Sequence, residues 1–181
     1  MTRVVVSLDR ASDKWNRAFP LMPSKIEAAV AKAFLCAKKP AAFSRRAFEI
    51  NVVLTDDSNV RALNKNYRGK NKPTNVLSFP QFNLQKFRRA ALDIFPSGSG
   101  IPLGDIVLAF QTIRAECNEQ DKSLENHVIH LIVHGTLHLL GYDHTRTREA
   151  EAMEKLECDI LASLGYPDPY HEKSRLKKIK H

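Results

Sequence analysis

A short run with three histidines is the most reactive feature of this 181-residue chain. His134, His138 and His144 occupy positions i, i+4 and i+10 of the segment HGTLHLLGYDH. Residues four apart on an α-helix lie on one face, about 6 Å apart along the axis, so the first two imidazoles can share a metal ion. Gly141 allows the helix to end and turn, which brings His144 back toward them. Three neutral imidazoles with one open position are typical of a catalytic zinc site.

Two further histidines precede this run. His130, His134 and His138 form a rival set at i, i+4 and i+8, but a straight helix spreads them over about 12 Å. Metal–nitrogen bonds near 2.1 Å do not span that length easily, which favours His144 as the third ligand. We interpret His130 as a packed histidine or one that supports a ligand, and His127 as a polar residue near the start of the helix.

The same histidine spacing occurs in metzincin proteases, whose motif is HExxHxxGxxH. The glutamate after the first histidine is the general base of that motif. Gly135 occupies this position here and has no side chain to accept a proton. The sequence therefore argues against a peptidase of the usual kind, although the metal geometry can be shared.

Four segments together point to a family. HGTLHLLGYDH resembles the signature of the YbeY-type endoribonucleases, the bacterial rRNA maturation factors. The segment LNKNYRGKNKPTNVLSFP at 63–80, LGDIVLA at 103–109 and the stretch 153–170, which ends in LGYPDPY, agree with that family in order and distance. The resemblance covers about residues 45–170, and the stretch 83–101 is peculiar to this chain.

The resemblance implies a zincin-like α+β fold, with a small mixed sheet flanked by helices and the metal site on a helix and the turn after it. It implies one zinc per chain, bound by His134, His138 and His144, and a catalytic role for Arg68. The implied activity is a single-strand-directed endoribonuclease in rRNA processing, at the 3′ end of 16S rRNA, and in ribosome quality control. The implied partners are rRNA and ribosomal subunits, with ribosomal proteins or a ribosome-associated GTPase as further candidates.

A basic strip accompanies the arginine. The guanidinium of Arg68 suits a phosphate because it binds bidentately and stays charged. Lys65, Lys70 and Lys72 lie in the same stretch, which contains no acidic residue, and we expect them to bind the RNA backbone. Gly69 fits the end of a helix at this strip.

The proton acceptor of the reaction is left open by the sequence. Asp143 precedes a ligand histidine, so it either supports an imidazole through a hydrogen bond or caps the turn. No Glu or Asp is clearly placed as a general base. Either a zinc-bound hydroxide attacks without one, or the 2′-hydroxyl of the RNA is the nucleophile. Two other functions remain: a zinc hydrolase of another class, a peptidase or amidase, and a ribosome-associated binding protein with a structural metal.

Composition limits the class of protein. A formal net charge of +8 favours polyanionic partners, nucleic acid first and anionic membrane second. The chain has no run of 18 apolar residues and no export signal, so we expect a cytoplasmic protein without a membrane span. Cys36, Cys117 and Cys158 form no CxxC pair, and we expect each to be a small buried apolar residue. Residues 1–170 are predicted to form one domain, followed by a basic, disordered tail at 171–181.

The elements that must position these groups follow from hydrophobic periodicity and breakers. Strands are predicted at 3–8, 48–54, 76–79 and 106–109, and helices at 25–38, from 56 or 57 to 68, 111–119, 124–140 and 148–164. Residues 83–102, with a basic patch and the loop PSGSG at 96–100, are predicted to form a mobile insertion. Strands with helices segregated around them predict an α+β layer fold.

Overall fold

A four-stranded sheet runs through the centre of the molecule. The structure is a computed structural model that describes residues 2–171, except 21, 45, 83–92 and 97–98. The strands are β1 (Arg3–Arg10), β2 (Ala47–Thr55), β3 (Val76–Pro80) and β4 (Gly100–Ala109), in the spatial order β1-β2-β4-β3. β2 runs parallel to both of its neighbours, β1 and β4, whereas β3 pairs antiparallel with β4. The sheet is therefore mixed, and β3 forms one of its edges.

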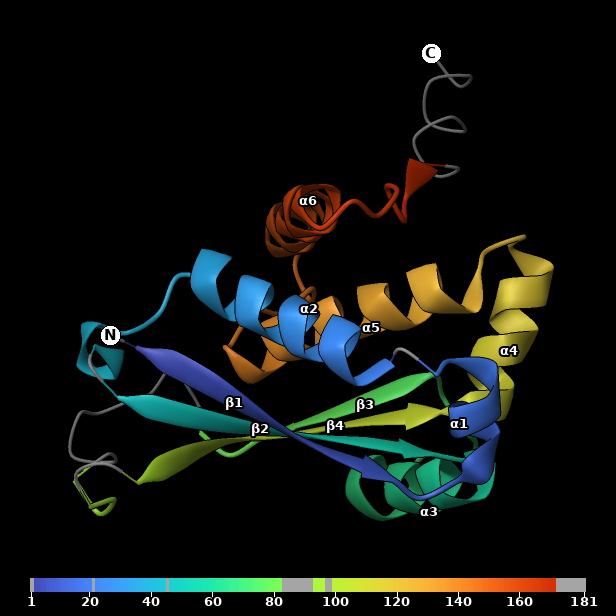
Figure 1. The fold of residues 1–181 in the computed structure, drawn as a ribbon, viewed down its shortest axis with the longest axis horizontal. Coiled ribbons are helices and arrows are strands. Elements are labelled where there is room, and N and C mark those ends of the chain that lie inside the picture. The colour runs from blue at the N-terminus through green and yellow to red at the C-terminus, as the bar shows by residue number, and fades with distance from the viewer. Residues whose placement is uncertain (1, 21, 45, 83–92, 97–98, 172–181) are drawn as a thin grey trace.

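Helices cover both faces of this sheet (Figure 1). They are α1 (Asp13–Ala18), α2 (Met22–Cys36), α3 (Asp57–Arg68), α4 (Phe110–Glu119), α5 (Leu124–Leu139) and α6 (Thr147–Ser163), with a short 3-10 helix at Ala41–Phe43. α2 and α5 pack on one face, α6 lies beyond them, and α3 lies on the opposite face. The result is the α+β arrangement predicted from the sequence, a small mixed sheet flanked by helices.

Two clusters of apolar side chains fill the layers. The larger one joins the sheet to α2, α5 and α6, and the smaller one joins it to α3 through Val60, Leu77, Val107 and Ala109. α5 lies between the sheet and the outer helices, so it is apolar on most of its circumference, as its sequence VIHLIVHGTLHL indicates. Its histidines are consequently held by packing on several sides.

α3 carries the basic strip and has defined ends. At its start, the side chain of Asp56 accepts a hydrogen bond from the backbone N–H of Asn59. At its end, Gly69 adopts φ 68°, the left-handed conformation that glycine reaches without strain. The sequence prediction of a helix end at Gly69 is confirmed.

Some predicted elements differ from the structure. β4 begins at Gly100 rather than at 106, because its first half pairs with β2 from Ala47 onward, with one register shift after Glu49, and local sequence does not reveal this long-range contact. The short helix α1 was not predicted, and the second helix begins at Met22 rather than at 25. The insertion predicted at 83–102 and the tail predicted at 171–181 lie largely outside the described residues.

The cysteine prediction is right for one residue only. Cys117 is buried, but Cys36 is exposed and Cys158 is half-buried. Cys36 is the last residue of α2, beyond the face that packs on the sheet, and Cys158 lies on α6, where its thiol donates to Asp168 Oδ1 at 3.3 Å. Composition gave no information on which side of a helix each thiol lies.

Candidate metal centre and its cleft

The three predicted histidines converge in the structure. His134 and His138 lie on α5, and His144 lies in the turn that follows the left-handed Gly141, whose φ is 87°. One ring nitrogen from each histidine lies within 4.8 Å of the other two. The Nε2 atoms of His134 and His138 are 3.0 Å apart. The helix therefore presents two imidazole nitrogens to one point, and the turn brings the third to it.

Hydrogen bonds at the Nδ1 atoms orient the first two rings. His138 Nδ1 lies 2.9 Å from the backbone carbonyl oxygen of Tyr142, which can only accept, so this nitrogen carries the proton. His134 Nδ1 lies 2.8 Å from Glu157 Oε1, and a carboxylate likewise accepts. When a ring oriented in this way is neutral, its Nε2 atom carries a lone pair that faces the common point.

This donor set fits a zinc ion. Two lone pairs only 3.0 Å apart repel each other unless a cation lies between them. Tetrahedral zinc with bonds near 2.1 Å holds its ligand nitrogens about 3.4 Å apart, close to the separation of this pair. Burial, and next the neighbouring His134 and His144, lower the pKa of His138 to about 4, which keeps its ring neutral near pH 7. The ligand form of the imidazole is thus the form that the site favours.

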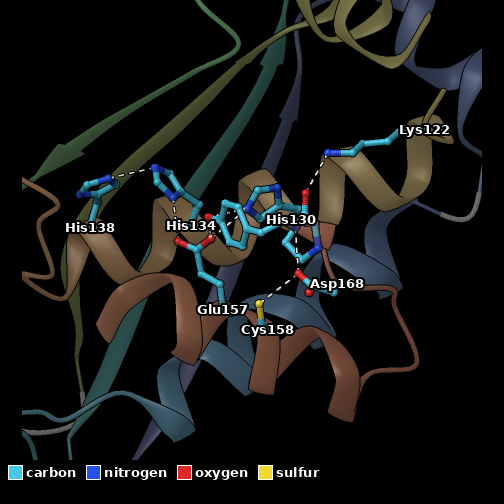
Figure 2. A network of polar contacts seen from close by, with 9 residues as sticks. Lys122, His130, His134, His138, Glu157, Cys158 and Asp168 are labelled. Atoms are coloured by element: carbon cyan, nitrogen blue, oxygen red, sulfur yellow. Dashed lines mark hydrogen bonds and ion pairs between the residues drawn. The ribbon is translucent and has the colours of Figure 1, made fainter. Parts of the chain in front are cut away.

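A buried glutamate contacts the Nδ1 side of the His134 ring (Figure 2). Glu157 of α6 has no exposed surface, yet its carboxylate receives hydrogen bonds from His134, from His130 Nε2 at 2.8 Å and from the hydroxyl of Tyr170. Burial alone raises the pKa of this carboxyl, but the hydrogen bonds from the two histidines outweigh it and lower the pKa to about 2. Glu157 is therefore an anion that fixes the tautomer of His134.

Sequence reasoning missed Glu157, although a signal was present. The residue lies on the apolar stripe of α6, between Met153 and Ile160, both of which are buried. A charged residue in the buried stripe of an amphipathic helix requires a partner inside the protein. The partners are His130 and His134 on α5. His130 therefore contacts Glu157, which in turn holds the ring of His134.

The structure contains a second group with the composition of a metal site. His130, His134 and Glu157 also present ligand atoms within 4.8 Å of one another. Here, however, the facing atoms are already joined by hydrogen bonds of 2.8 Å. The cluster of His134, His138 and His144 opens on a cleft instead, so an ion and a substrate could both reach it.

The cleft in front of the histidines has a volume of about 690 Å³. The edge strand β3 and the turn after α5 form its walls. Its lining residues are Arg68, Asn75, Val76, Ser78, Pro80, Phe82, His134, His138, Gly141, Tyr142, Asp143 and His144. Arg68, the last residue of α3, thus reaches the same cleft as the three histidines, although it comes from the opposite face of the sheet.

The predicted basic strip lies beside the cleft. Lys65, Lys70 and Lys72 are exposed and do not line the cleft itself. Their segment is fixed by Asn64, a buried residue whose side-chain amide donates to the carbonyl oxygen of Lys72 at 2.7 Å. The lysines consequently extend the positive charge of Arg68 along the surface.

Asp143 contacts its own turn. Its Oδ1 accepts from the backbone N–H of His144 at 2.7 Å, and its Oδ2 accepts from the hydroxyl of Thr145 at 3.3 Å. These bonds favour the capping alternative over a hydrogen bond to an imidazole. The role of supporting a ligand, which the sequence suggested for Asp143, belongs to Glu157 in this geometry.

His127 lies near the start of α5, as interpreted from the sequence, and it is buried. Its exposed fraction is 5%, and its Nε2 lies 2.7 Å from Glu116 Oε2. The carboxylate of Glu116 also receives the side-chain amide of Asn75, which lines the cleft. This pair therefore joins α4 and α5 to the floor of the cleft.

The absence of a side chain at Gly135 has a steric cause. A Cβ atom there would lie 2.9 Å from Ile106 Cγ2 and 3.1 Å from Ser78 Oγ. Helix α5 thus approaches β3 and β4 so closely that a side chain at this position would displace its neighbours. A glutamate general base of the metzincin kind does not fit, which disfavours the peptidase alternative.

Comparisons with known proteins agree with this geometry. The family model described as Endoribonuclease YbeY matches residues 12–165. A protein named Endoribonuclease YbeY from Bradyrhizobium sp. is 52% identical over 128 residues, which cover 71% of this chain and 72% of the relative. One of the same name from Sinorhizobium medicae is 44% identical over 171 residues, which cover 94% of this chain and 96% of the relative.

A solved structure from Thermotoga maritima matches with a TM-score of 0.49 at 20% identity, covering 91% of this chain and 98% of that one. The family match extends over most of the chain, including the three histidines, Arg68 and Glu157. The zincin-like α+β fold expected from the resemblance is confirmed, and the chain belongs to the Endoribonuclease YbeY family.

Proposed function

We propose that this protein is a zinc-dependent endoribonuclease that cleaves single-stranded stretches of ribosomal RNA during maturation of its 3′ end and in ribosome quality control. It acts in the cytoplasm as one catalytic domain, residues 1–170, on rRNA within ribosomal subunits. Ribosomal proteins or a ribosome-associated GTPase are its expected protein partners. No helix among the described residues is both long enough and apolar enough to cross a membrane.

The observation that carries this proposal is the convergence of three imidazoles and one arginine on one cleft. His134, His138 and His144 form a cluster with an open side, and Arg68 lines the same cleft. Phosphodiester cleavage needs a cation beside the oxygens on which negative charge develops. The cleft offers this cation next to the metal ligands.

Each residue has a distinct task. His134, His138 and His144 would hold the metal, while Glu157 and the Tyr142 carbonyl fix the protons of the first two rings at Nδ1. When bound, zinc supplies a Lewis acid that acts on a phosphoryl oxygen or on a water molecule. The guanidinium of Arg68 binds the phosphate bidentately, and the lysine strip holds the neighbouring RNA backbone.

Zinc-replete protein incubated with a structured rRNA fragment and, separately, with casein tests the proposal. We expect cleavage of the RNA and none of casein. Arg68→Ala should lower single-turnover cleavage roughly a hundredfold, because a charge-assisted contact made in the transition state is worth on the order of 3 kcal/mol. Arg68→Lys should not restore the full rate, because an ammonium cannot form the guanidinium fork.

Lys70→Ala is the matched control on the same strip. It should weaken RNA binding and lower the salt dependence by about one unit of slope while leaving the rate of bound RNA unchanged. Cleavage of casein in place of RNA would replace the proposal with the peptidase alternative. If Arg68→Ala cleaves RNA as fast as the parent, Arg68 is only a solvated residue at the end of α3 and has no role in cleavage.

A further inference from the structure

An exposed aromatic ring lies next to the arginine of the cleft. Tyr67 has an exposed fraction of 71% and is the one aromatic among the large hydrophobic side chains found exposed in the described part of the chain. It precedes Arg68 at the end of α3, in the strip that also carries Lys65 and Lys70. A large apolar surface in water within a basic strip is a typical feature of single-stranded nucleic acid binding.

Packing of the protein core does not account for this ring. Tyr67 makes an edge contact with Phe79 of β3, with ring centroids 5.1 Å apart and planes at 60°. The apolar cluster beneath α3 is already covered by Phe79, Leu63 and Val53. The edge contact therefore holds the tyrosine ring in place while leaving most of its surface in water.

The position of β3 connects this ring with the histidines. Ser78 and Pro80 line the cleft, and Phe79, between them, points to the opposite face, because side chains alternate along a strand. β3 is an edge strand, so in the described part of the chain no further strand of the sheet lies beyond it. An RNA strand with a phosphate on Arg68 can therefore pass around the edge of β3 toward Tyr67.

We propose that Tyr67 is a stacking platform for a nucleobase adjacent to the phosphate held by Arg68. The ligand is an unpaired base of RNA, since a base within a duplex is already stacked on its neighbours and cannot lie on a protein ring. Stacking on tyrosine tolerates any base, so the platform selects single strands rather than a sequence. This inference rests on the proposed RNA-directed function and deepens it.

Binding of a single-stranded 2′-O-methyl RNA oligonucleotide, checked for integrity after each titration, tests the platform. Tyr67→Ala should weaken binding about tenfold, the effect of losing one stacked base. Tyr67→Phe should bind within about twofold of the parent, since the stacking face remains. Leu35→Ala removes an apolar side chain of similar exposure from α2 and should have no effect. The affinity for a duplex of the same sequence should be equal in all four proteins.

A spectroscopic readout separates stacking from a general loss of structure. The chain has a single tryptophan, Trp15, which is fully buried, so Tyr67→Trp adds the one exposed indole. The oligonucleotide should quench its fluorescence, and the duplex should not. Unchanged affinity of Tyr67→Ala, equal loss for single strand and duplex, or an unquenched indole would each overturn the platform.

The two proposals fail in different ways. If the parent cleaves rRNA while Tyr67→Ala binds the oligonucleotide normally, the platform is wrong and the nuclease function stands. If the parent neither binds nor cleaves RNA, the proposed function itself is wrong. Quenching of the indole by a protein but not by RNA would mark this face as a protein-docking surface and would also overturn the platform.

Discussion

Replacing Glu157 with glutamine tests how the metal centre is held in place. Glutamine has nearly the same volume, and its carbonyl oxygen can still accept the Nδ1 proton of His134. Its NH₂ group then faces His130 Nε2 and the Tyr170 hydroxyl, where the carboxylate now accepts two hydrogen bonds. Since an amide nitrogen only donates, His130 must move its proton from Nε2 to Nδ1.

The cost of that move follows from the surroundings of His130. Its Nδ1 is buried and has no hydrogen-bond partner among the described residues, so a proton placed there is left unsatisfied. A buried unsatisfied donor costs about 1–3 kcal/mol, and the remaining bonds also lose the negative charge of their acceptor. We expect Glu157→Gln to lower the free energy of unfolding of the zinc-free protein by about 2–3 kcal/mol.

The same substitution should weaken zinc binding about tenfold, because His134 then donates to a neutral amide, which makes its Nε2 a weaker ligand. Urea unfolding followed by circular dichroism measures the first effect, and competition with a chelator measures the second. Glu151→Gln, on an exposed position of the same helix, is the control and should change neither. A Glu157→Gln protein with the stability and zinc affinity of the parent would refute this role of the carboxylate.

Three further outcomes are expected. His138→Ala should abolish retention of about one zinc per chain in elemental analysis, whereas His130→Ala should retain it; equal zinc in both would contradict the ligand assignment. Gly135→Ala should lower the free energy of unfolding by about 1–2 kcal/mol, because its Cβ would lie 2.9 Å from Ile106 Cγ2; an unchanged urea midpoint would show that the helix can shift. Burial lowers the pKa of His130 and His138, so below pH 6.5 the unfolded chain binds more protons than the folded one. The urea concentration at the unfolding midpoint of zinc-free protein should therefore be lower at pH 5 than at pH 7.5. A higher midpoint at pH 5 would contradict this sign.

Local patterns predicted the parts of the site that local geometry determines. One helical turn separates His134 from His138, and Gly141 allows the helix to end, so spacing favoured the cluster that the structure shows over the rival set with His130. Glu157 and Tyr170 reach the site through the packing of α6 and the chain after it, which no short segment encodes. The same holds for the first half of β4, whose strand structure depends on pairing with β2.

The three histidines of the cluster are close together in sequence, whereas the paired strands of the sheet are far apart in sequence. The three candidate ligands lie on α5 and the turn after it, while β1 must find β2 across the whole of α2, and β2 must find β4 across α3 and β3. Because closing long loops costs chain entropy, we expect the sheet to form more slowly than the histidine cluster. The unfolded chain already has the three candidate ligands close together in sequence, so zinc could bind both states and would then stabilise the native state by less than its affinity implies. Comparing the zinc-induced rise in the free energy of unfolding with the value calculated from the dissociation constant would reveal this shortfall.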